Sequence, residues 1–198
     1  MKSIILASKS IDRKKILKRA KIPFEVMATN INEDILKKEF SNPIELVEQL
    51  ARAKALNAKE ILAKEGKKAI IIAADTIVEL NSEIIGKAEN KEEAFSILKK
   101  LVGKTHKLIT GIAITETNNP KIITDYECTQ VKFLELTDDE IWGYLKTDEW
   151  RGRAGAYSIR EKASLFIEAI QGSSSNVIGL PMNKLFEILK EEFNVSLL

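Results

Sequence analysis

One carboxylate stands inside an otherwise apolar run of the sequence. The run covers residues 69–78 and is broken only by Asp75 and Thr76. A buried carboxylate is costly unless it is paired, hydrogen-bonded or bound to a metal ion, so Asp75 is a candidate general base or metal ligand. Glu33 is a second carboxylate that could share a metal ion with it. The alternative is that the strand ends at Ala74 and Asp75 begins a turn, but the apolar residues that follow favour a functional role.

Two serines and two cations at the start of the chain could bind an anion. Ser8 and Ser10 precede an expected helix, and the free N–H groups and dipole of a helix N-terminus favour phosphate. Arg13 and Lys14 lie in its first turn, where they could reach the same anion. The competing interpretation is a solvated basic face, because residues 9–21 contain seven basic side chains and one acid.

Two further lysines are candidate cations. Lys54 lies four residues after Leu50 and four before Ala58, on the inward stripe of an expected helix. Such a lysine either extends to the edge of the apolar surface or serves a pocket, and the pattern alone favours the first. Lys87 directly follows Gly86, after an expected hairpin.

Composition limits the classes of function. The 198 residues are 44% hydrophobic and 30% charged with a net charge of +2, which is typical of a globular protein and argues against a general nucleic-acid binder. The single histidine and single cysteine exclude paired-histidine and multi-cysteine metal sites. We expect His106 to be structural rather than catalytic, and Cys128 to be a small core residue rather than a nucleophile. No apolar run approaches the roughly 20 residues of a membrane span, and no signal peptide is recognisable, so a cytoplasmic protein is expected.

Local signals predict an α/β fold, with a mixed β-sheet and flanking helices in one domain over residues 1–198. Strands are expected at 3–7, 23–27, 69–78, 83–85, 107–116 and 121–134. Helices are expected at 11–20, 43–64, 90–101, 138–146 and 181–193, with caps at Ser10, Asn42 and Thr137. Residues 32–41 are expected to form a loop or a ragged helix, and 152–160 and 172–181 to form ordered loops.

Five blocks of the sequence follow one another in a characteristic order. They are ILASKSIDRK at 5–14, AADTIV at 73–78 followed by Gly86-Lys87, GKTH at 103–106 followed by Thr110-Gly111, AGAYSI at 154–159, and GSSSNVIGLP at 172–181. They resemble the LASxSPRR, ADTxV…GKP, SGxxHxVxTG, AGAYGIQG and GxYSNVVGLP signatures of the Maf family of nucleoside triphosphate pyrophosphatases. Together the blocks span nearly the whole chain.

The resemblance implies a fold related to that of inosine triphosphatase, with two lobes around a central cleft. It also implies cleavage of a nucleoside triphosphate between its α- and β-phosphates, with a divalent cation such as Mg²⁺ or Mn²⁺, and a homodimer. The matching position makes Asp75 the expected catalytic base and a metal ligand, with Glu33 as the expected metal or water partner. The matches expected around the phosphates are Ser8, Ser10, Arg13, Lys54 and Lys87.

Three positions distinguish the branches of that family. The branch acting on dTTP and UTP has SPRR, ADT and IQG, whereas the 7-methyl-GTP branch has tryptophan for the first arginine, glutamine for the threonine and a glutamate near IQG. This chain has Asp12, Thr76 and Arg160 there. Thr76 agrees with the pyrimidine branch, but Asp12 and Arg160 match neither, and they could pair with each other. We expect a pyrimidine or modified nucleotide as substrate, in a house-cleaning role.

Two other classes of function remain open at this stage. The family takes its name from septum formation, so the first alternative is a nucleotide-binding interaction protein that inhibits cell division. Asp75, Lys54 and Lys87 favour the enzyme, because a protein that only binds nucleotide needs no buried base. An RNA-binding module that uses residues 9–21 is least favoured, because no aromatic stacking platform accompanies them. We therefore expect no stable nucleic-acid partner and no membrane partner.

Overall fold

The computed structural model describes residues 2–198, and its contacts divide the chain into two compact units. Unit 1 comprises the chain up to Asp75 together with Thr110–Glu127 and Ile178–Leu198. Unit 2 comprises Thr76–Ile109 and Cys128–Val177. The expectation that residues 1–198 form a single domain stays a prediction.

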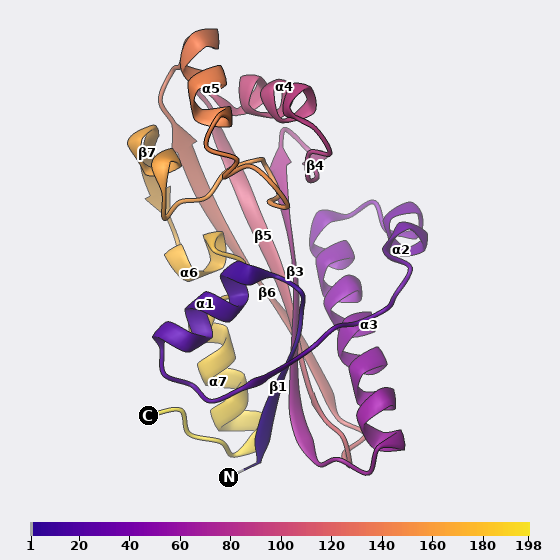
Figure 1. The fold of residues 1–198 in the computed structure, drawn as a ribbon. Helices are drawn as coiled ribbons and strands as arrows, with labels where there is room; N and C mark the ends of the chain where they lie inside the picture. Colours follow the sequence, from indigo (N-terminus) through magenta and orange to yellow (C-terminus); the bar gives the residue numbers. More distant parts are fainter. Residues whose placement is uncertain (1) are drawn as a thin grey trace. The chain divides into compact units, whose positions relative to one another are not determined.

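Strands and helices alternate along much of the chain (Figure 1). The strands are β1 (Ser3–Ala7), β2 (Glu25–Met27), β3 (Ala69–Leu80), β4 (Glu83–Ile85), β5 (Thr105–Glu116), β6 (Ile122–Phe133) and β7 (Ile167–Gln171). The helices are α1 (Ile11–Arg19), α2 (Glu33–Glu39), α3 (Pro43–Lys64), α4 (Lys91–Leu101), α5 (Asp138–Leu145), α6 (Ser174–Val177) and α7 (Met182–Phe193), with a 3₁₀ turn η1 (Lys162–Leu165).

The strands form a mixed sheet, which confirms the predicted fold class. Their order is β2-β1-β3-β5-β6-β7, and β4 pairs with β3 beside this path. Strand β1 is parallel to both β2 and β3, whereas β4 is antiparallel to β3 and β7 is antiparallel to β6. Parallel and antiparallel pairing therefore occur in one sheet, and a short turn joins only the antiparallel pair β3–β4 among these pairs.

Unit 1 buries both faces of β1 and β3. Ile4 and Leu6 belong to one apolar cluster, whereas Ile5 and Ala7 belong to another, because successive strand side chains point to opposite faces. The first cluster includes residues of α1 and α7, and the second includes the inward alanines of α3. Figure 1 shows α3 on one side of these strands and α1 and α7 on the other. The continuous apolar run in β3 follows from this double burial.

A glycine lets α3 lie close to the sheet in unit 1. A Cβ added at Gly111 on β5 would lie 2.3 Å from the carbonyl oxygen of Val47 on α3. Any side chain at this position would therefore push the helix away. Lys54 lies two helical turns after Val47, on the same face of α3, so the glycine also helps to set the position of this lysine.

Unit 2 has a core of its own, rich in aromatic rings. Its cluster includes Phe133, Tyr144, Trp150, Tyr157 and Phe166, which are buried. Several of these rings meet edge to face, which is a favoured arrangement of aromatic pairs.

A tight hairpin joins β3 to β4 at the edge of this unit. Asn81 and Ser82 have φ of 51° and 68°, as a two-residue turn with both central residues left-handed requires. The hairpin expected before Gly86 and Lys87 is confirmed.

Most predicted elements are confirmed, but the 3₁₀ turn η1 was not predicted and several other differences occur. The expected loop or ragged helix at 32–41 contains the regular helix α2, and the expected loop at 172–181 contains the short helix α6. Strand β7 was not predicted. The prediction that Cys128 is a core residue was wrong, because its side chain is exposed on β6. By contrast, the His106 side chain is buried, with 1% of its surface exposed.

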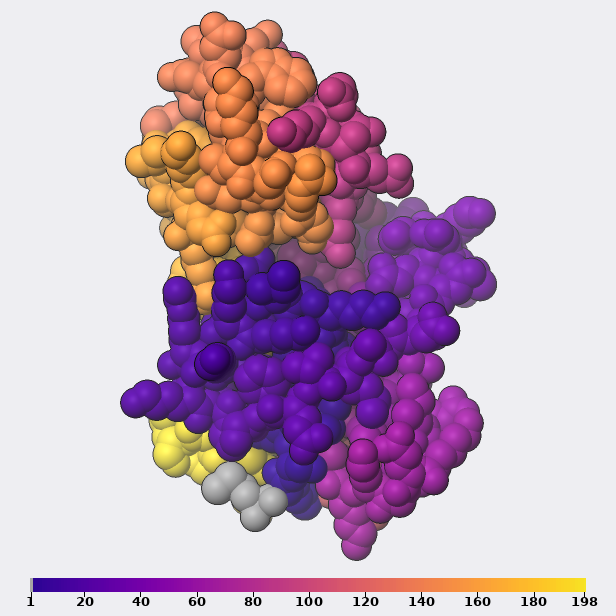
Figure 2. Space-filling view, in the orientation of Figure 1, coloured from indigo at the N-terminus to yellow at the C-terminus, as the bar shows by residue number. Residues whose placement is uncertain are grey.

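The space-filling view shows residues of the N-terminal part of unit 1, coloured indigo to violet, as a continuous surface (Figure 2). Among the described residues, no helix combines the length and apolar character needed to cross a bilayer.

Candidate active site

The loop between β1 and α1 holds a serine hydroxyl in a defined direction. Ser8 Oγ accepts a hydrogen bond from the Ser10 backbone N–H at 3.1 Å and another from Arg13 Nη1 at 3.2 Å. Ser10 caps α1, as predicted, by accepting from the Arg13 N–H at 3.4 Å. Within residues 2–198, the hydrogen of the Ser8 hydroxyl has no acceptor, so it can donate to an added anionic oxygen.

The Arg13 side chain connects this loop to a segment of unit 1 that is far away in the sequence. Its Nε donates to the carbonyl oxygen of Gly179 at 2.6 Å, across 166 positions of sequence. Burial lowers the pKa of Arg13, while the negative charges of Asp75, Glu33 and Asp12 act to raise it. The guanidinium therefore lies close enough to these carboxylates to interact with them electrostatically. Neighbouring Lys14 is half-buried, and its backbone N–H donates to the Ser10 carbonyl oxygen at 3.3 Å.

Lys54 is buried between two carboxylates. Its Nζ lies 2.5 Å from Asp75 Oδ1 and 2.8 Å from Glu33 Oε1, and the residue is 9% exposed. The interpretation favoured by its helical position alone, that the side chain extends to the surface, was therefore wrong. Strand β3 continues through Asp75 to Leu80, so the carboxylate does lie inside a strand rather than at a turn.

The local sequence explains how Glu33 reaches this cluster. Asn32 caps α2 by accepting from the Asp34 N–H at 3.2 Å, which places Glu33 in the first turn. An acidic side chain is favourable there because it interacts with the positive end of the helix dipole. Helix α2 has no buried residue, so the ion pair with Lys54 is a main attachment of Glu33.

The carboxylates of Glu33 and Asp75 suit a hard divalent cation that takes its other ligands from water and a substrate. Glu33 and Asp75 contact one ammonium nitrogen, so their oxygens lie near each other. No cluster of three or more histidine, cysteine or acidic residues that could hold a metal occurs in the described part of the chain. Mg²⁺ commonly uses one or two carboxylates and takes its other ligands from water and phosphate, which matches a two-carboxylate site.

The other predicted residues belong to unit 2. Lys87 is exposed and forms an antiparallel bridge with Ala154, whereas Thr76 and Arg160 are half-buried. Asp12, in α1, is half-buried and belongs to unit 1. Unit 1 thus brings together Ser8, Ser10, Arg13, Glu33, Lys54 and Asp75, and the roles of all these residues remain predictions.

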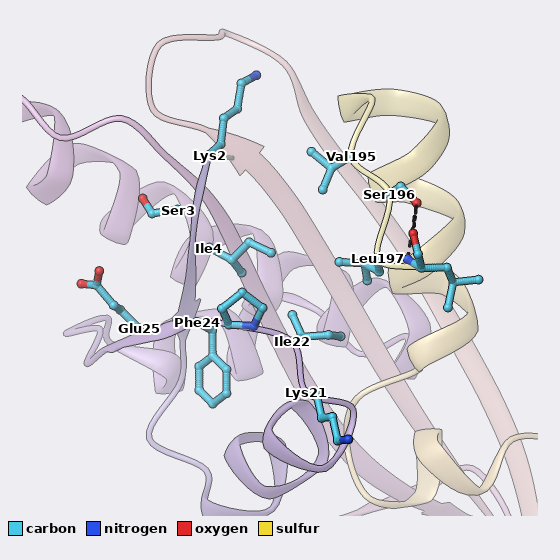
Figure 3. A pocket seen from close by; sticks show the side chains of 12 residues that line it. Lys2, Ser3, Ile4, Lys21, Ile22, Phe24, Glu25, Val195, Ser196 and Leu197 are labelled. Atoms are coloured by element: carbon cyan, nitrogen blue, oxygen red, sulfur yellow. Dashed lines mark hydrogen bonds between the residues drawn. The ribbon is translucent and has the colours of Figure 1, made fainter.

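A separate cavity of about 570 Å³ in unit 1 contains none of these residues. Ile4, Ile22 and Phe24 line it together with Val195 and Leu197 near the end of the chain (Figure 3). Its wall is mainly apolar, and Lys2, Lys21 and Glu25 also line it.

A comparison with known protein families shows to which family this chain belongs. The family described as Maf-like protein matches residues 3–192. The chain belongs to the Maf family. A relative of this Maf-family chain in Alkaliphilus oremlandii (strain OhILAs), named dTTP/UTP pyrophosphatase, is 44% identical over 100% of both chains. A protein of the same name in Thermoanaerobacter sp. (strain X514) is 42% identical, over 98% of this chain and 99% of that one.

A solved structure, the nucleoside-triphosphatase / dITP/XTP pyrophosphatase of Mycobacterium abscessus, is a much more distant match. It has a TM-score of 0.39 and 8% identity, covering 68% of the Maf-family chain and 75% of its own. The fold class therefore rests on the strand order and pairing described above.

Sequence reasoning did not single out two residues, one in each unit, that make hydrogen bonds across long sequence distances. Gly179 accepts from Arg13, and Asn176 Nδ2 donates to Leu108 O at 3.1 Å and to Thr129 Oγ1 at 3.0 Å within unit 2. Both lie in the GSSSNVIGLP block that resembles the family signature. The block signalled their importance, but its spacing gave no indication of their partners.

Proposed function

We propose that this protein is a nucleoside triphosphate pyrophosphatase, which hydrolyses its substrate to a nucleoside monophosphate and pyrophosphate. The observation that carries the proposal is the Asp75 carboxylate, which stands in an apolar strand and is held by the buried ammonium of Lys54. Membership of the Maf family, through residues 3–192, supports the same conclusion.

Asp75 is the proposed general base. It accepts a proton from water as the water oxygen attacks the α-phosphorus, and the bond to the bridging oxygen of the β-phosphate breaks to release pyrophosphate. The ammonium of Lys54, 2.5 Å from Asp75 Oδ1, holds this carboxylate in place. Glu33, on the other side of the same ammonium, keeps the lysine in place.

Ser8 and the cations are proposed to bind the phosphates. The Ser8 hydroxyl can donate to a phosphate oxygen because both contacts to its Oγ come from donors. Ser10, Arg13, Lys14, Lys54 and Lys87 complete the proposed set. A triphosphate carries several negative charges, and charge-assisted hydrogen bonds are roughly twice as strong as neutral ones. This explains why a chain with a net charge of only +2 can act on such a substrate.

Glu33 and Asp75 are the proposed ligands of a divalent cation, Mg²⁺ or Mn²⁺. When bound, such an ion neutralises phosphate charge and polarises the phosphoryl oxygen. Lys54, which bridges the two carboxylates in this structure, would then be able to turn its ammonium to a phosphate oxygen.

The names of the relatives support a pyrimidine substrate. Proteins at 42–44% identity over nearly their full lengths are named dTTP/UTP pyrophosphatase. Thr76 agrees with that branch. We therefore propose dTTP and UTP as substrates, in a house-cleaning role in the cytoplasm. The homodimer implied by the family resemblance also stays a prediction, which sedimentation of the purified protein can check.

Asp75→Asn tests the proposed base. The amide keeps the shape of the side chain and removes its basicity, so we expect the pyrophosphate-release rate with UTP to fall by about 10²–10⁴-fold. UTP binding, measured by calorimetry, should remain.

Glu79→Gln is the matched control. Glu79 is also a buried carboxylate on β3 that is paired with a lysine, Lys107, at 2.9 Å. Its amide variant should lose stability and keep the wild-type rate. Wild-type turnover by Asp75→Asn would exclude Asp75 as the base, whereas nucleotide binding without any pyrophosphate release by the wild type would favour the interaction protein.

A further inference from the structure

His106 and Tyr157 form a buried pair that the proposed chemistry does not use. His106 Nε2 lies 2.9 Å from Tyr157 Oη, within hydrogen-bond distance, and the rings meet edge to face with centroids 5.5 Å apart. His106 Nδ1 is buried and has no hydrogen-bond partner within residues 2–198. The contact with Tyr157 is therefore the polar interaction that fixes the orientation of this ring. Both residues belong to unit 2.

Tyr157 ends a segment whose backbone is constrained. Gly155 and Ala156 have φ of 71° and 60°, in the left-handed region that an alanine rarely adopts. A Cβ at Gly155 would lie 2.9 Å from Val78 Cγ2 and 3.1 Å from the Tyr157 ring. An unfavourable conformation of this kind persists only where surrounding contacts hold it, and the buried tyrosine provides such contacts.

The same segment holds the backbone of Lys87. Ala154 forms an antiparallel bridge with Lys87, and the Gly155 N–H donates to the Gly86 carbonyl oxygen at 3.1 Å. Lys87 itself is exposed, so these backbone contacts fix the point from which its side chain extends. A continuous path of contacts thus runs from His106 through Tyr157 and Gly155 to Lys87.

We propose that His106 and Tyr157 are positioning residues for Lys87, acting through the backbone of residues 154–157. The inference rests on the proposed function, in which Lys87 binds the triphosphate. It explains why the only histidine of the chain and the tyrosine of the AGAYSI block are buried together. It assigns neither residue a contact with the substrate.

Tyr157→Phe tests the proposal, because it removes only the hydroxyl that contacts His106. We expect kcat/KM for UTP to fall on the order of ten-fold, since small misplacements of a binding group cost rate steeply. In a Lys87→Ala background the same change should cost less than about two-fold, because the group being positioned is already absent. His106→Leu should behave like Tyr157→Phe, whereas His106→Gln, which keeps a hydrogen-bonding nitrogen, should restore part of the activity.

Phe166→Leu is the control for lost packing. Its ring contacts Phe133 and Tyr144 in the same core, so its loss lowers stability without breaking the hydrogen bond to His106. This variant should reduce kcat/KM by the same small factor with and without Lys87. Equal losses from Tyr157→Phe in the two backgrounds would overturn the proposal and leave the proposed function intact.

Amide hydrogen exchange gives a readout that does not depend on turnover. Tyr157→Phe should speed exchange in peptides covering residues 83–90 and 152–160, and Phe166→Leu should not do so selectively. Unchanged exchange in both peptides would refute the positioning role. If the wild-type protein releases no pyrophosphate from any triphosphate, the proposed function fails, and the exchange result still decides whether His106 and Tyr157 hold the Lys87 segment.

Discussion

Single residues in this protein owe their properties to partners that are far away in the sequence. Lys54 contacts a carboxylate 21 positions away, and Arg13 reaches a carbonyl 166 positions away. The residue types and the apolar run around Asp75 were enough to single out these side chains. Their pairing could not be predicted, because helical periodicity says which way Lys54 faces but not what it meets.

His106 gives a prediction for the pH dependence of stability. Burial lowers its pKa from 6.5 to about 4. Between these values the unfolded chain binds a proton that the folded chain does not, so the free energy of unfolding falls as the solution is acidified through this window. We expect His106 to contribute about 3 kcal/mol of that fall. Urea unfolding from pH 6.5 down to pH 4 measures it.

The matched variant for this measurement is His106→Gln, which cannot take up a proton. Because the chain has one histidine, the difference between the two pH profiles isolates its titration from that of the carboxylates. The variant should show the shallower profile. Parallel profiles would mean that His106 titrates in the folded protein as it does in the unfolded chain.

At the scale of elements, helices and strands with strong local sequence signals were predicted correctly, whereas those with weak signals were not. Helix α3 was predicted within its observed bounds because Asn42 caps it, Pro43 opens it and apolar residues recur at helical spacing. Strand β7 was not predicted, and the segment that contains helix α2 was left as either a loop or a ragged helix. Neither contains a fully buried residue, so no apolar periodicity marks them, and their pairing and packing partners determine them.

The close approach of α3 to β5 gives a prediction at this scale. Gly111→Ala places a Cβ against the Val47 carbonyl, where an added carbon would be 2.3 Å away. We expect a loss of about 1–3 kcal/mol in the free energy of unfolding, as for other overpacked sites, together with reduced turnover because Lys54 moves with α3.

Gly143→Ala is the corresponding change where space is available. Gly143 lies within α5, and no atom lies within 4 Å of its added Cβ. Alanine is the better helix former, so this variant should gain up to about 1 kcal/mol and keep wild-type turnover. Thermal unfolding and pyrophosphate release of both variants make the comparison. A neutral Gly111→Ala would show that α3 shifts without consequence for Lys54.

At the scale of the whole molecule, the family blocks are divided between the two units. Ser8, Arg13 and Asp75 belong to unit 1, and Lys87 and Tyr157 belong to unit 2. Each unit also has apolar clusters of its own. The order of the blocks predicts that these residues belong to one functional set, which stays a prediction, whereas the contacts within each unit had to come from the structure.

We propose that selectivity for the base depends on one charged residue of each unit. Asp12 in unit 1 and Arg160 in unit 2 carry charges that neither branch of the family shows at these positions. A carboxylate can accept from an exocyclic amino group such as that of cytosine, and a guanidinium can donate to a ring carbonyl. We therefore expect a profile broader than dTTP and UTP, with measurable activity on CTP.

The double change Asp12→Arg with Arg160→Gln should narrow this profile toward dTTP and UTP. The measurement is kcat/KM for UTP, dTTP, CTP and 7-methyl-GTP on the wild type, both single variants and the double variant. Asp139→Arg is the control, because Asp139 is an acid in the first turn of α5, as Asp12 is in α1, and its loss removes the same interaction with a helix dipole. If the double variant changes the CTP-to-UTP ratio no more than Asp139→Arg does, these two residues do not select the base, and Thr76 becomes the position to vary next.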